Sequence, residues 1–377
     1  MSAIDITNAN ADVAADECAA TAAPTPVPGI ELVPGDQPNL DAAAMDAASL
    51  RRDFLLDGTP APVYRLGVDP VPGAPLSCAV AIGAFDGVHL GHRHLIDRSV
   101  ADARARGLAA VAVTFDPDPD TVVASKPASK LLSVHDRLYA LACTGVDAVL
   151  VVPFTRELAA RDHVAFFQEV LAPVLDIRAV HVGAGFRLGA GGASTVQVIR
   201  DWGEPRGIEV TGHRLLLEDG TPVSATRIRG LVGAGELDAA ARQLGRRYFV
   251  RGTVVHGRGE GSKLGFPTAN VERRGRMQMP RDGVYAGWAL TDEGVAYPTA
   301  VNVGLPPMFA DDPDSSSLEA TLLGFSGDLY GHGLAVLLTK LLRPPVHFGS
   351  LAELVSAVEG NMEETRQLYG DTGIPLK

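Results

Sequence analysis

Two histidines flank a glycine where an apolar run gives way to a helical pattern. Residues 78–82 are typical of a buried strand, and residues 92–106 carry apolar side chains at helical spacing. His89 and His92 would then lie beside the free N–H groups at a helix start, where phosphate binds readily. Burying two imidazoles without partners is costly, which argues against a purely structural pair. The turn predicts a phosphate site made of Gly83, Phe85, Asp86, Gly87, His89, Gly91 and His92.

A second phosphate-binding pattern begins at residue 224. Ser224 and Thr226 open a predicted helix and offer hydroxyl groups that cap it and donate to an anion. Arg229 follows one turn later and can bind phosphate through two parallel N–H groups. An ordinary capped helix with surface arginines has the same pattern, so this signal is the weaker of the two.

A glycine-rich stretch at residues 256–270 ends in Pro267-Thr268-Ala269-Asn270. Gly257, Gly259 and Gly261 would let backbone N–H groups wrap phosphate oxygens. Thr268 and Asn270 offer neutral oxygen atoms that, with phosphate oxygens, can complete the ligand shell of Mg²⁺. A plain hairpin loop is the alternative explanation for the glycines.

The two-histidine turn and the segment that starts at residue 224 lie in a region where predicted strands and helices alternate. Strands are expected at residues 79–83, 109–115, 148–152, 179–182 and 209–210, and helices at 92–106, 133–144, 163–171 and 195–206. Such alternation predicts a doubly wound parallel α/β sheet, with ligands at the carboxyl ends of its strands. One or two further helices are expected over residues 225–244.

The pattern changes after residue 245. Short β-prone runs separated by Gly, Pro and Asp are found at residues 249–255, 283–291, 299–303, 318–325 and 334–342. They predict a second domain, an antiparallel β-barrel, closed by a helix at residues 351–368. The expected domains are therefore residues 76–235 and 246–377.

The composition of the chain limits its class. The 377 residues carry a net charge of −12, which disfavours nucleic acid as a partner. Residues 1–50 hold eight acidic residues and no Lys or Arg, and we expect an acidic extension over residues 1–66 to be disordered apart from a short helix near residues 42–56. The three cysteines form no disulfide framework and no apolar run is long enough to span a membrane, so we expect a cytoplasmic protein that does not bind membranes.

The chain resembles the bacterial bifunctional riboflavin kinase/FMN adenylyltransferases, also called FAD synthetases. Over roughly four fifths of its length it carries their motifs in order: Phe85–His92, Thr114–Pro117, Val223–Arg229, Leu264–Asn270, Gly283–Ala286 and Asp328–Gly331. The resemblance implies ATP and Mg²⁺ as cofactors and riboflavin and FMN as small-molecule substrates. It implies that His89, His92 and Arg229 act on ATP phosphates in adenylyl transfer. Glu319 matches the family's kinase base, although a glutamate on an exposed strand face is the alternative.

The sequence departs from the family pattern near the expected substrate pockets. Asp118 replaces a histidine, Gly185 and Phe186 stand in a segment that has lost a glutamate, and Met308 replaces a threonine. A further change puts Ala225 in place of a serine. These changes leave two alternatives open: a specialised paralogue that transfers a nucleotidyl group to a different phosphorylated acceptor, and a flavin- or nucleotide-binding regulator with little catalysis. The sequence does not indicate the oligomeric state.

Overall fold

The computed structural model describes residues 29–32, 37–41, 45–70, 73–257, 266–273, 275–304 and 317–377. These residues separate into two compact units. The first contains Gly58–Ala128 and Val134–Thr226, together with residues 29–32. The second contains residues 37–57, Ser129–Ser133 and Arg227–Lys377. Each unit is therefore built from stretches that are not continuous in the sequence.

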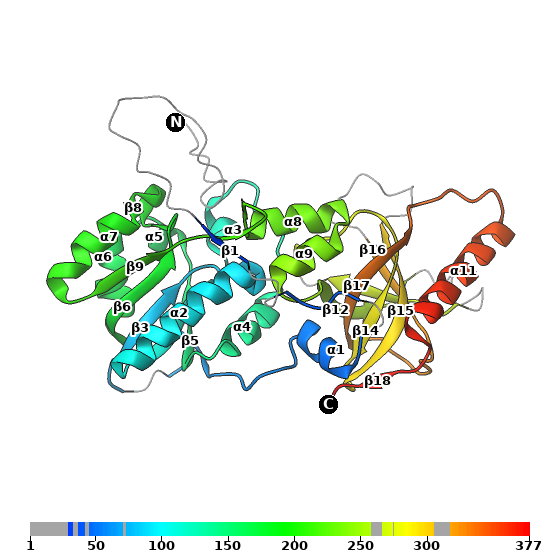
Figure 1. Cartoon of the computed structure of the whole chain (residues 1–377), viewed down its shortest axis with the longest axis horizontal. Helices are drawn as coiled ribbons and strands as arrows, with labels where there is room; N and C mark the ends of the chain where they lie inside the picture. The colour runs from blue at the N-terminus through cyan, green and yellow to red at the C-terminus, as the bar shows by residue number, and fades with distance from the viewer. Residues whose placement is uncertain are drawn as a thin grey trace, which may run out of the picture. The chain divides into compact units, whose positions relative to one another are not determined.

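A parallel sheet forms the centre of the first unit (Figure 1). Within the described residues its six strands follow the order β2-β5-β4-β3-β6-β9. Every neighbouring pair in it is parallel. The strands are β2 (Val63–Arg65), β3 (Leu76–Ile82), β4 (Ala109–Asp116), β5 (Ala148–Pro153), β6 (Leu175–Gly183) and β9 (Glu209–His213).

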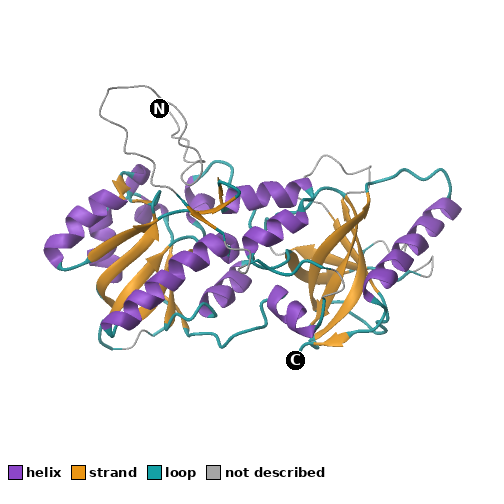
Figure 2. Ribbon diagram, in the orientation of Figure 1, coloured by secondary structure: helices purple, strands orange, loops and turns teal. Residues whose placement is uncertain are grey.

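Helices cover both faces of this sheet, as Figure 2 shows. Alternate residues of β3 point to opposite faces. Val80 joins a buried cluster with Phe166 and Ile199 on one face, whereas Ala79 packs with Ala103 on the other. The helices are α2 (Leu90–Arg106), α3 (Pro119–Val123), α4 (Val134–Ala142), α5 (Arg156–Ala159), α6 (His163–Ala165) and α7 (Val196–Gly203). The expected doubly wound fold is confirmed.

Short elements complete the first unit. The antiparallel pair β7 (Arg187–Leu188) and β8 (Ser194–Thr195) lies between β6 and α7. A small sheet joins β1 (Ile30–Glu31), β10 (Leu216–Glu218) and β11 (Thr221–Pro222). The division between the units falls within α8 (Ala225–Ala234), which precedes α9 (Leu237–Leu244).

The second unit is a closed antiparallel barrel, which confirms the second expected fold. In the described part of the chain, six strands follow the order β14-β17-β12-β13-β16-β15, and β14 pairs with β15 to close the ring. The strands are β12 (Phe249–Val255), β13 (Ala269–Arg273), β14 (Gly283–Thr291), β15 (Val295–Gly304), β16 (Ser317–Leu322) and β17 (Gly333–Arg343). The short β18 (Ile374–Pro375) adds to β15. The helix α11 (Leu351–Tyr369) packs against β14, where its Tyr369 contacts Trp288 at a centroid distance of 5.6 Å.

The short helix expected near residues 42–56 of the acidic extension is present. Residues 47–53 form α1 (Ala47–Asp53), whose N-cap Asp46 accepts a hydrogen bond of 2.8 Å from the Ser49 N–H. The physical reason is that this stretch carries apolar residues that become buried, so it repays the entropy of ordering. Leu50 and Phe54 are fully buried. Residues 1–28 lie outside the described residues, and none of the described helices is long and apolar enough to cross a membrane.

Candidate active sites

The two-histidine turn connects β3 to α2 in the first unit. Phe85 and Gly87 adopt left-handed conformations, with φ of 54° and 77°, which glycine tolerates without strain. His89 is the N-cap of α2, and its Nδ1 accepts a hydrogen bond of 3.3 Å from the His92 N–H. Because Nδ1 of a neutral imidazole accepts only when the proton is on Nε2, the His89 Nε2–H remains a donor. Gly83 and Asp86 lie in the same turn, and Asp86 is buried.

The rings of the two histidines are held against each other. His89 and His92 stack with centroids 3.6 Å apart and planes 19° apart, and Phe85 meets His92 edge-on at 5.3 Å. Burial, assisted by the nearby Arg137 guanidinium, lowers the pKa of His92 to about 3. The Nδ1 atom of His92 is buried and has no hydrogen-bond partner among the described residues. An orphaned polar atom at a helix start is suited to a bound phosphate group.

Val223, which precedes the second predicted phosphate element, lies beside the same helix start. A Cβ added to Gly91 would lie 3.2 Å from the His89 ring and 3.4 Å from the Val223 carbonyl oxygen, which is tight packing. Val223 directly precedes Ser224, and α8 begins at the next residue. Ser224 is half-buried and Thr226 is exposed. Arg229 lies one turn further along α8, which the sequence pattern predicted.

Asp118 lies in a buried ion pair rather than free in a pocket. Its carboxylate pairs with the Arg137 guanidinium, and the two side chains are only 8% and 2% exposed. Arg137 also donates a hydrogen bond of 2.7 Å to the carbonyl oxygen of Phe115 at the end of β4. The replacement of the family's histidine thus supplies a counterion to a buried arginine that lies close to His92.

Gly185 and Phe186 form the turn that follows β6. The Phe186 N–H donates to the Gly183 carbonyl oxygen at 2.9 Å, and Gly185 is exposed. The Phe186 ring is partly buried and packs against the apolar cluster of the sheet. This turn lies at the carboxyl end of its strand, as expected, but its aromatic ring serves packing.

A cavity of about 530 Å³ lies at the opposite edge of this sheet. It is lined by Phe167, Asp176, Trp202 and Arg206, among others. Asp176 belongs to the amino end of β6. Ligands of open α/β sheets bind at the carboxyl ends of the strands, so the cavity is not where we place the reaction.

Three neighbouring strands of the barrel align polar side chains in one row. In the strand register Glu319 on β16 lies opposite Asn270 on β13 and opposite Asn302 on β15. Residues directly opposite on antiparallel strands point to the same face. Their neighbours Leu318 and Ala320 are buried, so the row faces away from the apolar interior. Asn270 and Glu319, which the sequence placed far apart, are therefore adjacent.

Gly257, at the start of the glycine-rich stretch, lies against the Asn270 side chain. A Cβ added to Gly257 would lie 2.2 Å from the Asn270 Nδ2, so a larger residue here would displace the Asn270 amide. Thr268 is half-buried and precedes Asn270 by two residues, so the extended chain carries both on one face. His256 stacks on Tyr330 at 3.8 Å beside this loop. Gly259, Gly261 and Met308 lie outside the described residues.

The side-chain oxygen atoms of Thr268 and Asn270 are suitable ligands for a divalent metal ion that is also bound by the phosphate groups of a nucleotide. Among the described residues no cluster of three or more His, Cys, Asp or Glu side chains is able to hold a metal ion alone. Gly257 packs closely against the Asn270 amide. The amide oxygen of Asn270 and the hydroxyl of Thr268 are ligands of the type that a hard cation accepts. The remaining negative ligands would come from the nucleotide.

Sequence reasoning missed two residues of these sites. Asn302 belongs to a family motif, Asn302-Val303-Gly304, yet only the strand register shows that it joins the row of Glu319. Arg137 lies within a predicted helix, and no motif marked it. The signal in the sequence was Asp118 itself, because an aspartate in place of the family's histidine suggests a basic partner.

Both units thus present groups suited to phosphate, and a chain that combines them falls in the class of two-domain transferases that act on phosphate groups. Comparison with protein families supports this class. The FAD synthetase model matches residues 72–227, and the riboflavin kinase model matches residues 244–369. The chain belongs to the family of bifunctional riboflavin kinase/FMN adenylyltransferases, which confirms the resemblance found in the sequence.

Bacterial relatives match both units together. The bifunctional riboflavin kinase/FMN adenylyltransferase of Escherichia coli is 34% identical over 311 residues, covering 82% of this chain and 97% of the relative. That of Pseudomonas fluorescens is 32% identical, covering 77% and 93%. A solved structure described as a macrolide-efflux protein from Streptococcus pneumoniae has a TM-score of 0.68 at 24% identity, covering 81% of this chain and 98% of its own, and shows the fold alone. These matches give no support to a different phosphorylated acceptor.

Proposed function

We propose that the protein makes flavin cofactors in two ATP-dependent steps. The barrel unit phosphorylates riboflavin to FMN, and the α/β unit transfers AMP from ATP to FMN, which yields FAD and pyrophosphate. The observation that carries the proposal is the register that sets Glu319 beside Asn270, in a chain whose other unit sets His89 and His92 at a helix start. The two family matches, which fall on different units, support the same pair of reactions.

In adenylyl transfer, an FMN phosphate oxygen attacks the α-phosphorus of ATP and the bond to the β-phosphate oxygen breaks. The reaction needs alignment and stabilisation of the charge that develops on pyrophosphate. His89 donates from Nε2, His92 offers a second ring, and the N–H groups at the start of α2 add to the positive end of the helix dipole. Ser224, Thr226 and Arg229 hold further phosphate oxygens. Because the attacking phosphate is already ionised, this step needs no protein base.

In the kinase step, the ribityl hydroxyl of riboflavin loses its proton and attacks the γ-phosphorus of ATP, and ADP leaves. Glu319 accepts that proton. The glycine-rich stretch, to which Gly257, Gly259 and Gly261 belong, is assigned to the ATP phosphates by its sequence pattern. Thr268 and Asn270 would hold Mg²⁺, which would neutralise charge on the phosphate oxygens.

The remaining assignments follow from the same proposal. The catalytic domains correspond to residues 76–235 and 246–377, supported by the two family matches. From the sequence pattern we assign Gly185, Phe186 and Met308 to the flavin pockets, and Asp118 to the adenylyl site through its ion pair with Arg137. A cytoplasmic location is supported by Cys78 and Cys143, the described cysteines, which are unpaired.

A product assay tests the proposal. The purified protein is incubated with ATP and MgCl₂ and with either riboflavin or FMN, and the products are identified by chromatography and mass spectrometry. We expect FMN and FAD from riboflavin, and FAD from FMN. Formation of neither product would disprove the proposal, and a product from only one substrate would remove the corresponding half of it.

A further inference from the structure

A segment outside both family matches is built into the barrel unit. Residues 45–57, which we name the clasp, precede the first family match at residue 72. Nevertheless they belong to the second unit, together with Arg227–Lys377. The clasp consists of α1 and the turn that follows it.

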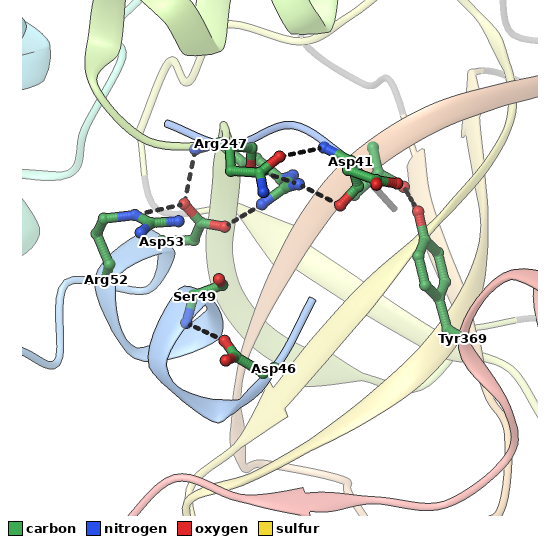
Figure 3. Close-up of polar contacts among 9 residues, drawn as sticks. Asp41, Asp46, Ser49, Arg52, Asp53, Arg247 and Tyr369 are labelled. Carbon is green, nitrogen blue, oxygen red and sulfur yellow. Dashed lines mark hydrogen bonds and ion pairs between the residues drawn. The ribbon is translucent and has the colours of Figure 1, made fainter. Parts of the chain in front are cut away.

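A buried ion pair joins the clasp to the start of the barrel. The Asp53 side chain is fully buried, and its Oδ1 and Oδ2 accept hydrogen bonds of 3.0 and 2.9 Å from the Arg247 backbone N–H and Nη1 (Figure 3). Arg247 is 5% exposed. Its other terminal nitrogen donates to the carbonyl oxygens of Asn39 and Asp41 at 3.1 and 3.4 Å. Both the charge and the backbone of Arg247 are therefore satisfied by residues that precede the α/β sheet in the sequence.

Apolar and terminal contacts extend this interface. Phe54 is fully buried and meets Phe249, the first residue of β12, at a centroid distance of 5.8 Å. Leu50, one turn earlier on α1, is also fully buried. Arg51 donates a hydrogen bond to the carbonyl oxygen of Leu376, next to the last residue of the chain. The clasp thus contacts both the beginning and the end of the barrel sequence.

Arg247 lies just before β12, the strand that is followed by the glycine-rich stretch of residues 256–270. Phe249, two residues later, begins β12, and β12 ends at Val255, which lies opposite Asn270. Without the clasp, the guanidinium of Arg247 would be a buried charge without the Asp53 counterion, which strongly destabilises a folded protein. Phe249 would at the same time lose its contact with the Phe54 ring.

We propose that the surface around Arg247 and Phe249 is a docking site for the clasp, a short helix with an aspartate at its end, and that the barrel needs this docking to hold β12. Asp53 is then a positioning residue for the kinase unit supplied from outside the family domain. The activity readout rests on the proposed function, whereas the exchange and binding readouts below do not depend on it.

Two truncations separate the clasp from the rest of the extension. A chain that begins at residue 37 loses β1 from the first unit but keeps the clasp, and a chain that begins at residue 58 loses both. The two are compared by hydrogen exchange of the β12 amides and by both product assays. We expect the chain from residue 58 alone to lose protection in β12 by about 10²–10⁴-fold, the scale for leaving a buried charge unpaired. Kinase activity should fall with it, while adenylyl transfer matches that of the chain from residue 37.

Single substitutions in the full chain test the proposal even if the chain from residue 58 fails to fold. Asp53→Asn in the full chain should lower β12 protection, whereas Asp371→Asn, at an aspartate of the same unit with a 59% exposed side chain, should not. A synthetic peptide of residues 37–57 should bind the chain from residue 58 and restore both β12 protection and kinase activity. The same peptide with Asp53→Asn should bind at least about tenfold more weakly.

The exchange and activity measurements distinguish failure of the clasp proposal from failure of the proposed function. Unchanged β12 protection in the chain from residue 58 and in Asp53→Asn would overturn the proposal. Equal loss of protection in both units would also overturn it, because a general folding defect would then be responsible. A full chain with no kinase activity would end the proposed function, while the exchange and peptide measurements would still test the clasp.

Discussion

His92 stacks on His89 with centroids 3.6 Å apart, and Phe85 packs edge-on against His92 at 5.3 Å. The stack fixes both imidazoles before any nucleotide binds. A donor that is already oriented costs no reorganisation when charge develops on a leaving group. The arrangement explains how two neutral rings serve a polyanionic substrate.

Removing the His92 ring should reduce adenylyl transfer. His92→Ala is expected to lower kcat for FAD formation from FMN by about 10²–10³, the scale for loss of one preorganised donor. Kinase activity should be unchanged, because Glu319 and Asn270 lie in the other unit. The matched control is His135→Ala, whose side chain is 82% exposed on the first unit. An equal loss of FMN formation would contradict the assignment of separate sites.

His92 should stay neutral well below its ordinary titration range. Burial lowers the pKa of His92 to about 3 from 6.5. Between these values the unfolded chain takes up a proton that the native ring refuses, so this group's contribution to stability is lost as the pH falls from about 7 towards 3. A ring-proton NMR titration of the ligand-free protein, assigned with the His92→Gln variant, should show no His92 inflection between pH 5 and 8. An inflection near 6.5 would show that the ring is not buried as described.

Asp118→Asn should destabilise the first unit. It leaves the Arg137 guanidinium, 2% exposed, without its counterion, which is expected to cost about 3–5 kcal/mol in the free energy of unfolding. The double variant Asp118→Asn with Arg137→Met should recover most of that loss. Asp176→Asn removes a half-exposed pair with Arg178 and should cost about 1 kcal/mol or less. Denaturant titration measures all three, and equal values for Asp118→Asn and Asp176→Asn would contradict the buried pair.

Gly257→Ala should impair the kinase through Asn270. The new Cβ would lie 2.2 Å from the Asn270 Nδ2, so the amide must move. Displacement of a positioning group by about 1 Å costs up to about 10²-fold in rate, and we expect a loss of that order in FMN formation. Gly360→Ala on α11, which meets open space, should have no such effect. Unaltered kinase kinetics in Gly257→Ala would refute the contact.

Glu319→Gln should remove the kinase base while keeping its size. FMN formation is expected to fall by about 10²–10⁴ in kcat, the range for a lost general base. FAD formation from added FMN should remain. Glu272→Gln, at an exposed glutamate of the neighbouring strand β13, serves as the control. If Glu319→Gln retains full kinase activity, the proton must go to another group.

Periodicity in the sequence was sufficient to predict the sheet that carries the two-histidine turn. The apolar run ending at Ile82 and the glycine-rich turn after it mark a strand-to-helix junction, and both were correct. The two phosphate motifs were also recognisable one by one. What local patterns cannot contain is the register between distant strands, which alone places Asn302 beside Glu319.

Long-range electrostatic pairs were equally inaccessible. Asp118 was assigned to a substrate pocket from the sequence, but its ion pair with Arg137, 19 residues away in a helix with no motif, could not be predicted. The short helix near residues 42–56 was expected, but the complete burial of Leu50 and Phe54 was not. In both cases the burial depends on the whole fold and is not visible in the local sequence.

The pairing of Asp53 with Arg247 spans 194 residues of sequence. At synthesis rates of about 5–20 residues per second, Asp53 leaves the ribosome about 10–40 s before Arg247 does. Throughout that interval Leu50 and Phe54 have no barrel to cover them, and the nascent chain offers a short apolar segment to chaperones. A segment translated before the whole α/β sheet is consequently among the last to reach its native partners.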